Sequence, residues 1–326
     1  MILPLLIYMF MVPTQAAEKQ KIAQTGFQFL SVVSDARAAA LGCAVNSLEL
    51  GSSSLFFNPA GMANMKTLFD VTASDNRWIA DIHHNTFSLA VNPKQGMWGV
   101  FGFSFQSVDY GDITGTLYAN TPERFIDLEE KIKPTAYSFG FGYAKALSDK
   151  FSVGGQIHWV KQDFGDLVVH VNDTTLTKKA YSLSPLAYDF GTLFKTGIKS
   201  LVFSMSVRNF SEQVKYIEDG FQLPMVFTLG ISFDLFDFIT VPGPKQSAFL
   251  NIDARHDRSH AEQVLVGLEY KLMNILSLRT GYISNADETS MNYGLGVSLY
   301  KIEFDYAYTP YGIFKDVQRM TVRFAL

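Results

Sequence analysis

The chain has 326 residues, of which 48% are hydrophobic, 18% are charged and 14% are aromatic, and its formal net charge is −4. So much apolar surface would collapse, which excludes a disordered chain, and the acidic balance argues against a nucleic-acid partner, which requires a concentrated basic face. After the first sixteen residues, no uninterrupted apolar run reaches the roughly 18 residues of a membrane-spanning helix, so a helical membrane protein is also excluded.

The first sixteen residues are typical of an export signal. Met1 to Val12 is apolar, and Thr14 and Ala16 place small residues ahead of a cleavage point after Ala16. Such a segment directs secretion and is removed from the mature protein. A buried N-terminal helix is the alternative, but Pro4 and Pro13 interrupt the segment. We therefore predict a signal peptide over residues 1–16.

Residues 17–66 differ from everything that follows them. The stretch from Asp35 to Leu48 is rich in alanine and leucine, which favours a short helix, with Gly42 inside it at some cost. The turn Asn58-Pro59-Ala60-Gly61 then ends the segment. We expect this helix and turn to form a separate N-terminal unit ahead of a larger domain at residues 67–326.

From about Thr67 to the end, large apolar residues alternate with small or polar ones. Between Tyr137 and Ala144, for example, four aromatic residues alternate with serine, glycine and alanine. This period of two is typical of strands with two different faces. It predicts about fourteen strands, at 67–74, 84–91, 97–109, 137–144, 151–159, 181–190, 201–208, 225–233, 247–256, 262–270, 276–283, 292–299, 302–309 and 319–324.

The connections between these strands also alternate, in length. Short turns are expected at 92–96, 148–150, 195–199, 271–274 and 300–301, and longer polar loops at 110–134, 165–179, 210–222 and 284–290. Short turns at one end and long loops at the other are typical of bacterial outer-membrane barrels.

A soluble β-sandwich is the competing interpretation, because its strands alternate as well. It fits less well, since here one face of every strand is large and apolar while the other is small, with many glycines and serines. A lipid-facing exterior and a crowded interior explain both faces. We therefore predict an all-β fold: a transmembrane antiparallel β-barrel of about fourteen strands, in contact with outer-membrane lipids, with a short N-terminal helical plug.

The alternation also assigns charged side chains to the lumen. Both signs occur there, which suits a paired network that holds the plug better than an ion pore of one sign. Asp35 and Arg37 of the plug are expected to pair with these charges; a helix in the periplasm is the alternative for this segment. The predicted lumen charges are Arg208, Asp253, Arg255, Glu269, Arg279, Glu303, Asp305, Arg319 and Arg323.

The residues that could carry chemistry do not form a recognisable catalytic, cofactor or metal site. His256 and His260 are four residues apart, a spacing that suits zinc binding only on a helix. Here the two histidines bracket a tight loop. His83 and His84 are adjacent in a strand and therefore point to opposite faces. Cys43 is expected to be a small filler inside the plug. We expect no enzymatic activity.

Several short motifs resemble those of a known family. The run from Asp35 to Gly42 and the turn Asn58-Pro59-Ala60-Gly61 resemble the N-terminal signature of the PorV/PorQ family, which is similar to FadL-type fatty-acid channels. The segments Leu147–Gly155, Val207–Ser211 and Asp316–Arg319 continue the resemblance. It implies a fourteen-stranded barrel with a plug that contains Asp35, Arg37, Gly42, Asn58, Pro59 and Gly61.

Two functions follow as hypotheses. The first, implied by the resemblance, is a role in type IX secretion, in which the long loops bind exported proteins with a C-terminal signal domain or secretion-complex subunits. The alternative is a FadL-like channel for hydrophobic small molecules, suggested by the plug turn and by aromatic loop residues such as Phe125, Tyr181 and Phe221.

Overall fold

A computed structural model describes residues 25–118, 125–172, 175–239, 243–286, 290–312, 314 and 316–326. The predicted signal peptide, and with it the start of the N-terminal unit, lies outside these residues. In the part of the chain that is described, none of the helices is both long and apolar enough to cross a membrane.

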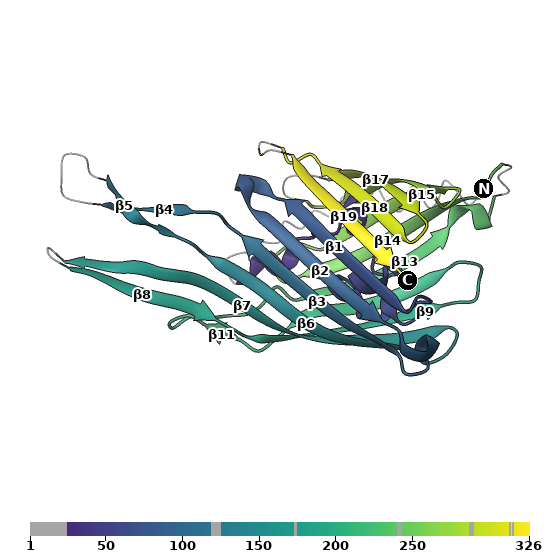
Figure 1. The fold of residues 1–326 in the computed structure, drawn as a ribbon, viewed down its shortest axis with the longest axis horizontal. Coiled ribbons are helices and arrows are strands. Elements are labelled where there is room, and N and C mark those ends of the chain that lie inside the picture. The colour runs from purple at the N-terminus through teal and green to yellow at the C-terminus, as the bar shows by residue number, and fades with distance from the viewer. Residues whose placement is uncertain are drawn as a thin grey trace.

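Fourteen antiparallel strands of the described chain form one closed barrel, as the alternation predicts (Figure 1). The ring closes because β1 pairs with β19 and β6 pairs with β7, so the wall has no open edge. Its strands are β1 (Phe69–Arg77), β2 (His83–Val91), β3 (Val100–Asp109), β6 (Thr135–Ala146), β7 (Phe151–Asn172), β9 (Leu186–Lys195), β10 (Val202–Phe210), β13 (Val226–Asp234), β14 (Gln246–Asp257), β15 (Gln263–Leu272), β16 (Leu276–Ile283), β17 (Met291–Leu299), β18 (Ile302–Thr309) and β19 (Val317–Ala325).

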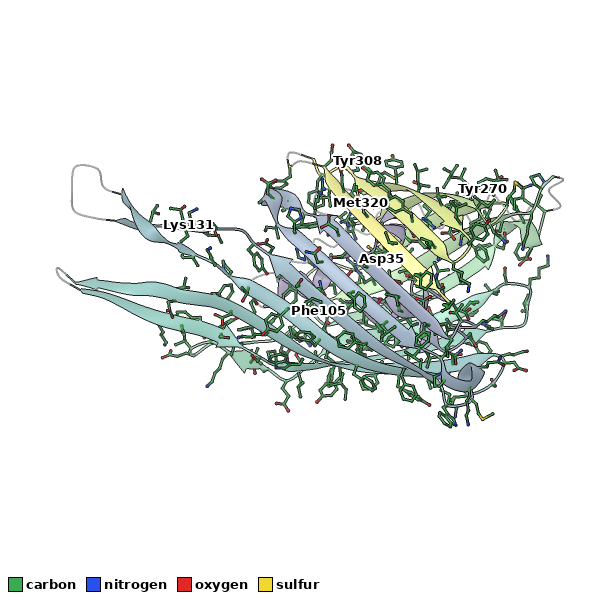
Figure 2. All side chains as sticks on the ribbon, viewed as in Figure 1. Asp35, Phe105, Lys131, Tyr270, Tyr308 and Met320 are labelled. Atoms are coloured by element: carbon green, nitrogen blue, oxygen red, sulfur yellow. The ribbon has the colours of Figure 1, made fainter. Side chains whose placement is uncertain are left out.

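The large apolar side chains point outward and the small ones inward. In β3, the phenylalanines Phe101 and Phe103 are exposed while Gly102 and Ser104 are buried. The outward rings also pack across strands, as Phe105 does against Phe139 at 4.8 Å between ring centroids. Figure 2 shows side chains such as Phe105 covering the outer surface of the wall. A broad apolar exterior of this kind is what a bilayer requires.

The long connections contain more strand than the sequence predicts. β7 continues past the wall to pair with β8 (Thr175–Leu183), and β4 (Ile113–Tyr118) pairs with β5 (Phe125–Ile132); both hairpins project beyond the barrel (Figure 1). A small ladder joins β11 (Val214–Lys215) to β12 (Gly220–Phe221). The loops predicted at 110–134, 165–179 and 210–222 are therefore largely or partly ordered strands, because alternation continues through polar sequence.

The predicted bounds of the strand at 181–190 are wrong, because this range contains the end of one strand and the start of another. Leu183 ends β8 and Leu186 begins β9, with Pro185 between them; its carbonyl accepts a hydrogen bond from the Val160 amide. Proline cannot donate to a ladder, which separates the two strands. The strand predicted at 97–109 begins only at Val100, because residues 97–99 still belong to a turn.

The plug, residues 25–66, lies inside the barrel and consists of short helical turns (η marks a 3₁₀ helix). The helix predicted from Asp35 to Leu48 is only five residues long, because Gly42 adopts a left-handed conformation with φ 61° and ends it. The elements are η2 (Gln28–Ser31), α2 (Ala36–Ala40), η3 (Gly51–Phe56) and η4 (Pro59–Met62); η5 (Ile79–Asp81), η6 (Pro93–Gly96) and η7 (Leu235–Asp237) lie in connections between strands.

Inward glycines allow the plug backbone to approach the wall. A Cβ atom on Gly154 of β7 would lie 2.5 Å from the Ala60 amide nitrogen, and one on Gly267 of β15 would lie 2.7 Å from the Leu41 carbonyl oxygen. Neither contact is sterically possible. The many glycines of the small face therefore reflect contact with the plug as well as the taper of the lumen.

Candidate functional site: linked cavities above an anchored plug

We describe the lumen as two halves. The short-turn half lies toward the turns at 92–99, 147–150 and 300–301, and the long-loop half lies toward the projecting hairpins. The plug occupies both halves, but its contacts with the wall differ between them.

Asp35 and Arg37 begin α2 and act differently. Arg37 donates two hydrogen bonds to Glu269 of β15, at 2.9 Å and 2.8 Å, which is a bidentate ion pair. Asp35 pairs with no lumen charge among the described residues, contrary to expectation. Its carboxylate caps α2 by accepting from the Ala38 amide at 2.8 Å and also accepts from the Ser53 hydroxyl at 3.0 Å.

The turn Asn58-Pro59-Ala60-Gly61 is buried where the plug meets β9. Asn58 accepts from the Ala60 amide at 3.1 Å, and its side-chain amide donates to the carbonyls of Asn46 at 2.9 Å and Thr192 at 3.1 Å. Pro59 opens η4 at a position that needs no amide hydrogen. A side chain on Gly61 would strike Ser54 and the Leu48 carbonyl. This turn therefore joins two parts of the plug to the wall.

Arg279 organises a buried charge network in the short-turn half. It donates to Glu269 at 2.6 Å, to Asp305 at 2.5 Å and to Glu303 at 3.3 Å. Arg323 extends the network by pairing with Asp70 at 2.6 Å. The network contains four cationic and four acidic side chains, so it is balanced in charge: Arg37, Lys271, Arg279 and Arg323, with Asp70, Glu269, Glu303 and Asp305.

Three predicted lumen charges of the long-loop half lack such a partner. Among the described residues, no carboxylate lies within ion-pair distance of Arg208, Arg255 or Arg319. Arg208 donates to the Phe56 carbonyl, Arg255 to Gln263 at 2.6 Å, and Arg319 to Thr309 and to the Val33 carbonyl, both at 2.8 Å.

The carboxylates near these arginines have other partners. Asp253 is fully buried and accepts from the Asn46 amide at 2.9 Å, and Asp257 accepts from the Ser259 amide at 2.8 Å. Three arginines of the long-loop half are therefore held only by neutral groups.

A cavity of about 370 Å³, which we call the chamber, opens between the plug and strands β14 to β19. Its apolar lining includes Val32, Val33 and the ring of Trp78, which packs edge-on against Tyr311 at 5.1 Å between ring centroids. The Arg319 guanidinium also lines the chamber and lies over the Trp78 ring, 5.5 Å from its centroid. The chamber thus combines aromatic surface with cationic hydrogen-bond donors.

A wider outer cleft of about 870 Å³ lies beyond the chamber, toward the long loops. Its aromatic residues form a continuous row in which Tyr216 stacks on Phe221 and also contacts Phe164, each at 5.5 Å. Burial, with a further contribution from Asp163, raises the pKa of Tyr216 to about 12, so its phenol stays neutral.

Gln28 separates the outer cleft from the chamber, because its side chain borders both. The side-chain amide donates to the Thr25 hydroxyl at 2.5 Å and to the Ser259 hydroxyl at 3.2 Å. The described start of the plug is therefore a partition between the two spaces.

Smaller cavities continue inward from the chamber. One of about 20 Å³ shares Val33, Cys43 and Arg255 with it, and a further one of about 30 Å³ lies beside Arg208. Arg208 borders all three of the small cavities described in this region. Spaces of this size hold about one water molecule, so these three cavities are too small for an organic ligand.

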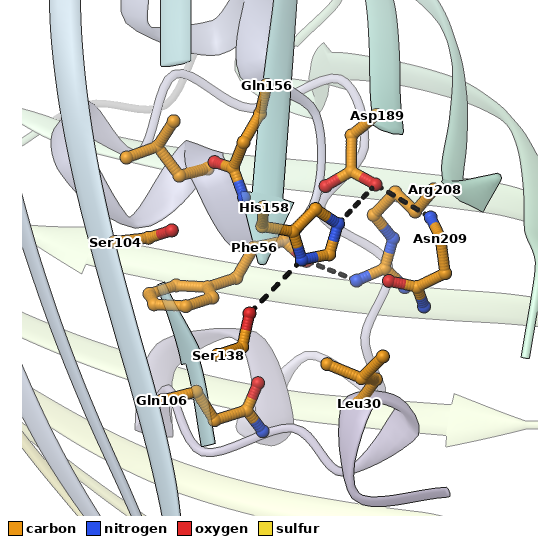
Figure 3. A pocket seen from close by; sticks show the side chains of 11 residues that line it. Leu30, Phe56, Ser104, Gln106, Ser138, Gln156, His158, Asp189, Arg208 and Asn209 are labelled. Carbon is orange, nitrogen blue, oxygen red and sulfur yellow. Dashed lines mark hydrogen bonds and ion pairs between the residues drawn. The ribbon is translucent and has the colours of Figure 1, made fainter. Parts of the chain in front are cut away.

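Sequence reasoning missed the polar cluster at the inner end of these cavities (Figure 3). His158 lies 3.2 Å from both the Ser138 hydroxyl and the Asp189 carboxylate, which also accepts from the Asn209 amide at 2.7 Å. Alternation places His158 on the inward face, but its partners come from β6 and β9. A register shift in β10 turns both Arg208 and Asn209 inward, which strict alternation cannot predict.

The remaining histidines and the cysteine lie in different surroundings. His256 faces Glu262 at 3.1 Å and His260 faces Asp257 at 3.7 Å, at the long-loop end of β14. Within the described ranges, no group of three or more histidine, cysteine or acidic side chains is arranged to hold a metal ion. Cys43 is partly exposed and borders the chamber, so it is more than a buried filler.

Comparisons with known proteins establish the fold. No family model and no curated protein sequence matches the chain. Among solved structures, a CymD monoaromatic hydrocarbon channel matches with a TM-score of 0.60 at 11% identity, over 91% of this chain and 98% of that one. The chain shares its fold.

Two further structures agree with this match. The toluene transporter TbuX of Ralstonia pickettii covers 89% of this chain and 97% of its own, with a TM-score of 0.56 at 11% identity. The toluene transporter TodX of Pseudomonas putida covers 88% and 95%, also with a TM-score of 0.56 at 11% identity. All three are channels or transporters by description.

Proposed function

We propose that the protein is an outer-membrane channel that takes up small molecules with a largely apolar body. The observation that carries this proposal is the chamber, an aromatic-lined cavity inside a closed barrel, reached from the long-loop end through the outer cleft. Long loops of outer-membrane barrels face the cell exterior. The fold shared with hydrocarbon and toluene channels supports the same function.

The order of the cavities suggests how a molecule would move. It would first meet the aromatic row around Tyr216 in the outer cleft, then pass the partition at Gln28 and enter the chamber beside Trp78. The balanced charge network would keep the rest of the plug attached to the wall during this step. Only the segment before α2 then has to move, which costs less than expelling the whole plug.

Uptake of naphthalene by cells that express the barrel tests the proposal. Expressing cells should accumulate it faster than cells without the barrel. Val32→Trp, which places a large ring in the chamber, should abolish this difference in accumulation. Val264→Trp is the matched control, because Val264 is exposed on the outer wall. Equal accumulation of naphthalene and of its 2-carboxylate with and without the wild-type barrel, at equal amounts of folded protein, would refute the proposal.

The projecting hairpins favour a second candidate function, the capture of exported proteins expected from the PorV/PorQ resemblance. β8 pairs only with β7 among the described strands, so its other edge is available for another chain. Cross-linking in intact cells, followed by mass spectrometry, tests it. Recovery of exported proteins with a common C-terminal domain supports a type IX role, and recovery of the barrel alone counts against it.

A further inference from the structure

We propose that the chamber selects compact organic anions, molecules with a small aromatic or alicyclic body and one carboxylate, over pure hydrocarbons. This inference rests on the proposed channel function and specifies its cargo. It is carried by the unpaired arginines of the long-loop half and by free hydrogen-bond donors in the chamber lining.

The chamber lining contains donors that no described residue accepts from. Asn292 is 4% exposed; its oxygen accepts from Thr309 at 2.8 Å, while its amide nitrogen has no partner. The Nε of Arg255 is also buried without a partner, and both residues border the chamber. Leaving a buried donor without an acceptor is unfavourable, so both groups favour a ligand that brings an acceptor.

The charges that border the chamber favour a negatively charged acceptor. Arg255 and Arg319 both line it, while the carboxylate beside them, Asp257, is held by the Ser259 amide and His260. Removing an unpaired cation from water is unfavourable, and an anion of the ligand would supply the missing partner. Arg208 continues the same excess of positive charge toward the inner cavities.

The shape of the cavity limits the body of the ligand. Trp78, Val33 and Ile283 provide apolar surface, and about 370 Å³ lies at the lower end of the range of small-molecule sites. The adjoining cavities hold about 20 to 30 Å³ each, too little for an extended chain. A compact ring with a carboxylate therefore matches the chamber better than a long-chain acid.

Binding of three probes of similar shape tests this inference: naphthalene-2-carboxylate, naphthalene-2-carboxamide and 2-methylnaphthalene. Calorimetry with the purified full chain in nanodiscs should give the carboxylate an affinity at least roughly tenfold higher than the hydrocarbon, the range of a charged hydrogen bond. The amide should fall between them.

Arg255→Gln should remove most of this preference, because it removes the free Nε donor and the charge together. Arg77→Gln is the matched control, since Arg77 is an exposed arginine at the long-loop end of its own strand, β1. Heat-dependent migration in gels establishes that each variant is folded. Should Arg255→Gln not fold, added sodium chloride provides the same comparison in the wild type, because chloride competes with the carboxylate, and not with the hydrocarbon, for the arginines.

The outcomes separate this inference from the proposed function. A preference for the carboxylate that Arg255→Gln, or salt, removes supports the inference. Equal or tighter binding of the hydrocarbon overturns the inference and leaves the channel function intact. A carboxylate preference that survives both Arg255→Gln and salt overturns the arginine argument. Failure of all three probes to bind, together with equal accumulation by cells with and without the barrel, overturns both the inference and the channel function.

Discussion

The two halves of the lumen differ in the partners of their buried cationic side chains. In the short-turn half, Arg279 is surrounded by Glu269, Glu303 and Asp305, and the plug contributes Arg37 to the same network. In the long-loop half, Arg208, Arg255 and Arg319 have only neutral partners, and they border cavities. Paired charge marks the anchored part of the plug, and unpaired charge marks the cavities.

The largest effect is expected from comparing one arginine of each half. Arg279→Met removes the guanidinium that Glu269, Glu303 and Asp305 share and leaves the buried Asp305 carboxylate without a described ion pair, so it should lower the free energy of unfolding by about 3–5 kcal/mol. Arg208→Met removes a cation with no described ion pair and replaces it with an apolar side chain of similar length, so it should cost less than about 1 kcal/mol. Urea unfolding in lipid vesicles measures both. Equal losses would show that the two halves do not differ in this respect.

The next effect concerns the contact between plug and wall in the short-turn half. A Cβ on Gly154 would overlap the backbone of Pro59 and Ala60, whereas one on Gly155 would lie 3.4 Å from its nearest neighbour, the Asp189 carbonyl oxygen. Gly154→Ala should therefore destabilise the barrel by about 1–3 kcal/mol. Gly155→Ala, the matched control, should change stability little. Displacement of the plug should also raise the single-channel conductance of Gly154→Ala and leave that of Gly155→Ala unchanged.

A smaller effect is expected where α2 begins. Asp35 caps the helix and accepts from Ser53, while the buried hydroxyl of its neighbour Ser34 has no partner. Asp35→Ala should cost about 1 kcal/mol, and Ser34→Ala should be neutral or slightly stabilising. Thermal unfolding of the two variants provides the comparison, and an equal loss in both would argue against the capping role.

The smallest effect concerns Tyr216, in the outer cleft of the long-loop half. Because burial raises its pKa to about 12, the neutral phenol is favoured in the folded state. The preference of the folded state for the neutral phenol therefore stabilises the protein fully below about pH 10, the pKa of a free tyrosine. This stabilisation is lost as the pH rises through about 12, where the Tyr216 phenol of the folded protein ionises. In an ultraviolet titration, Tyr216→Phe should lose a phenol that ionises near the upper end of this range; loss of an earlier one would contradict the assignment.

Strand number and facing could be predicted from the sequence because both depend on a local period. The aromatic residues around Phe139 and the glycines between them alternate whichever strands lie next to them. The same period places Arg279 and Arg255 in the lumen, although it assigns them no partners. The predicted bounds failed where a single residue interrupts an element: Pro185 separates two strands, and Gly42 ends the helix early.

The sequence by itself determined that the barrel strands have an apolar face and a small polar face that carries charges of both signs, because side-chain direction alternates along every strand. Only the tertiary structure decided which charges meet. Arg37 and Glu269 are 232 positions apart, and barrel closure brings them together. The chamber arises for the same reason, because it is the space that the plug leaves unfilled between Val33 and Trp78.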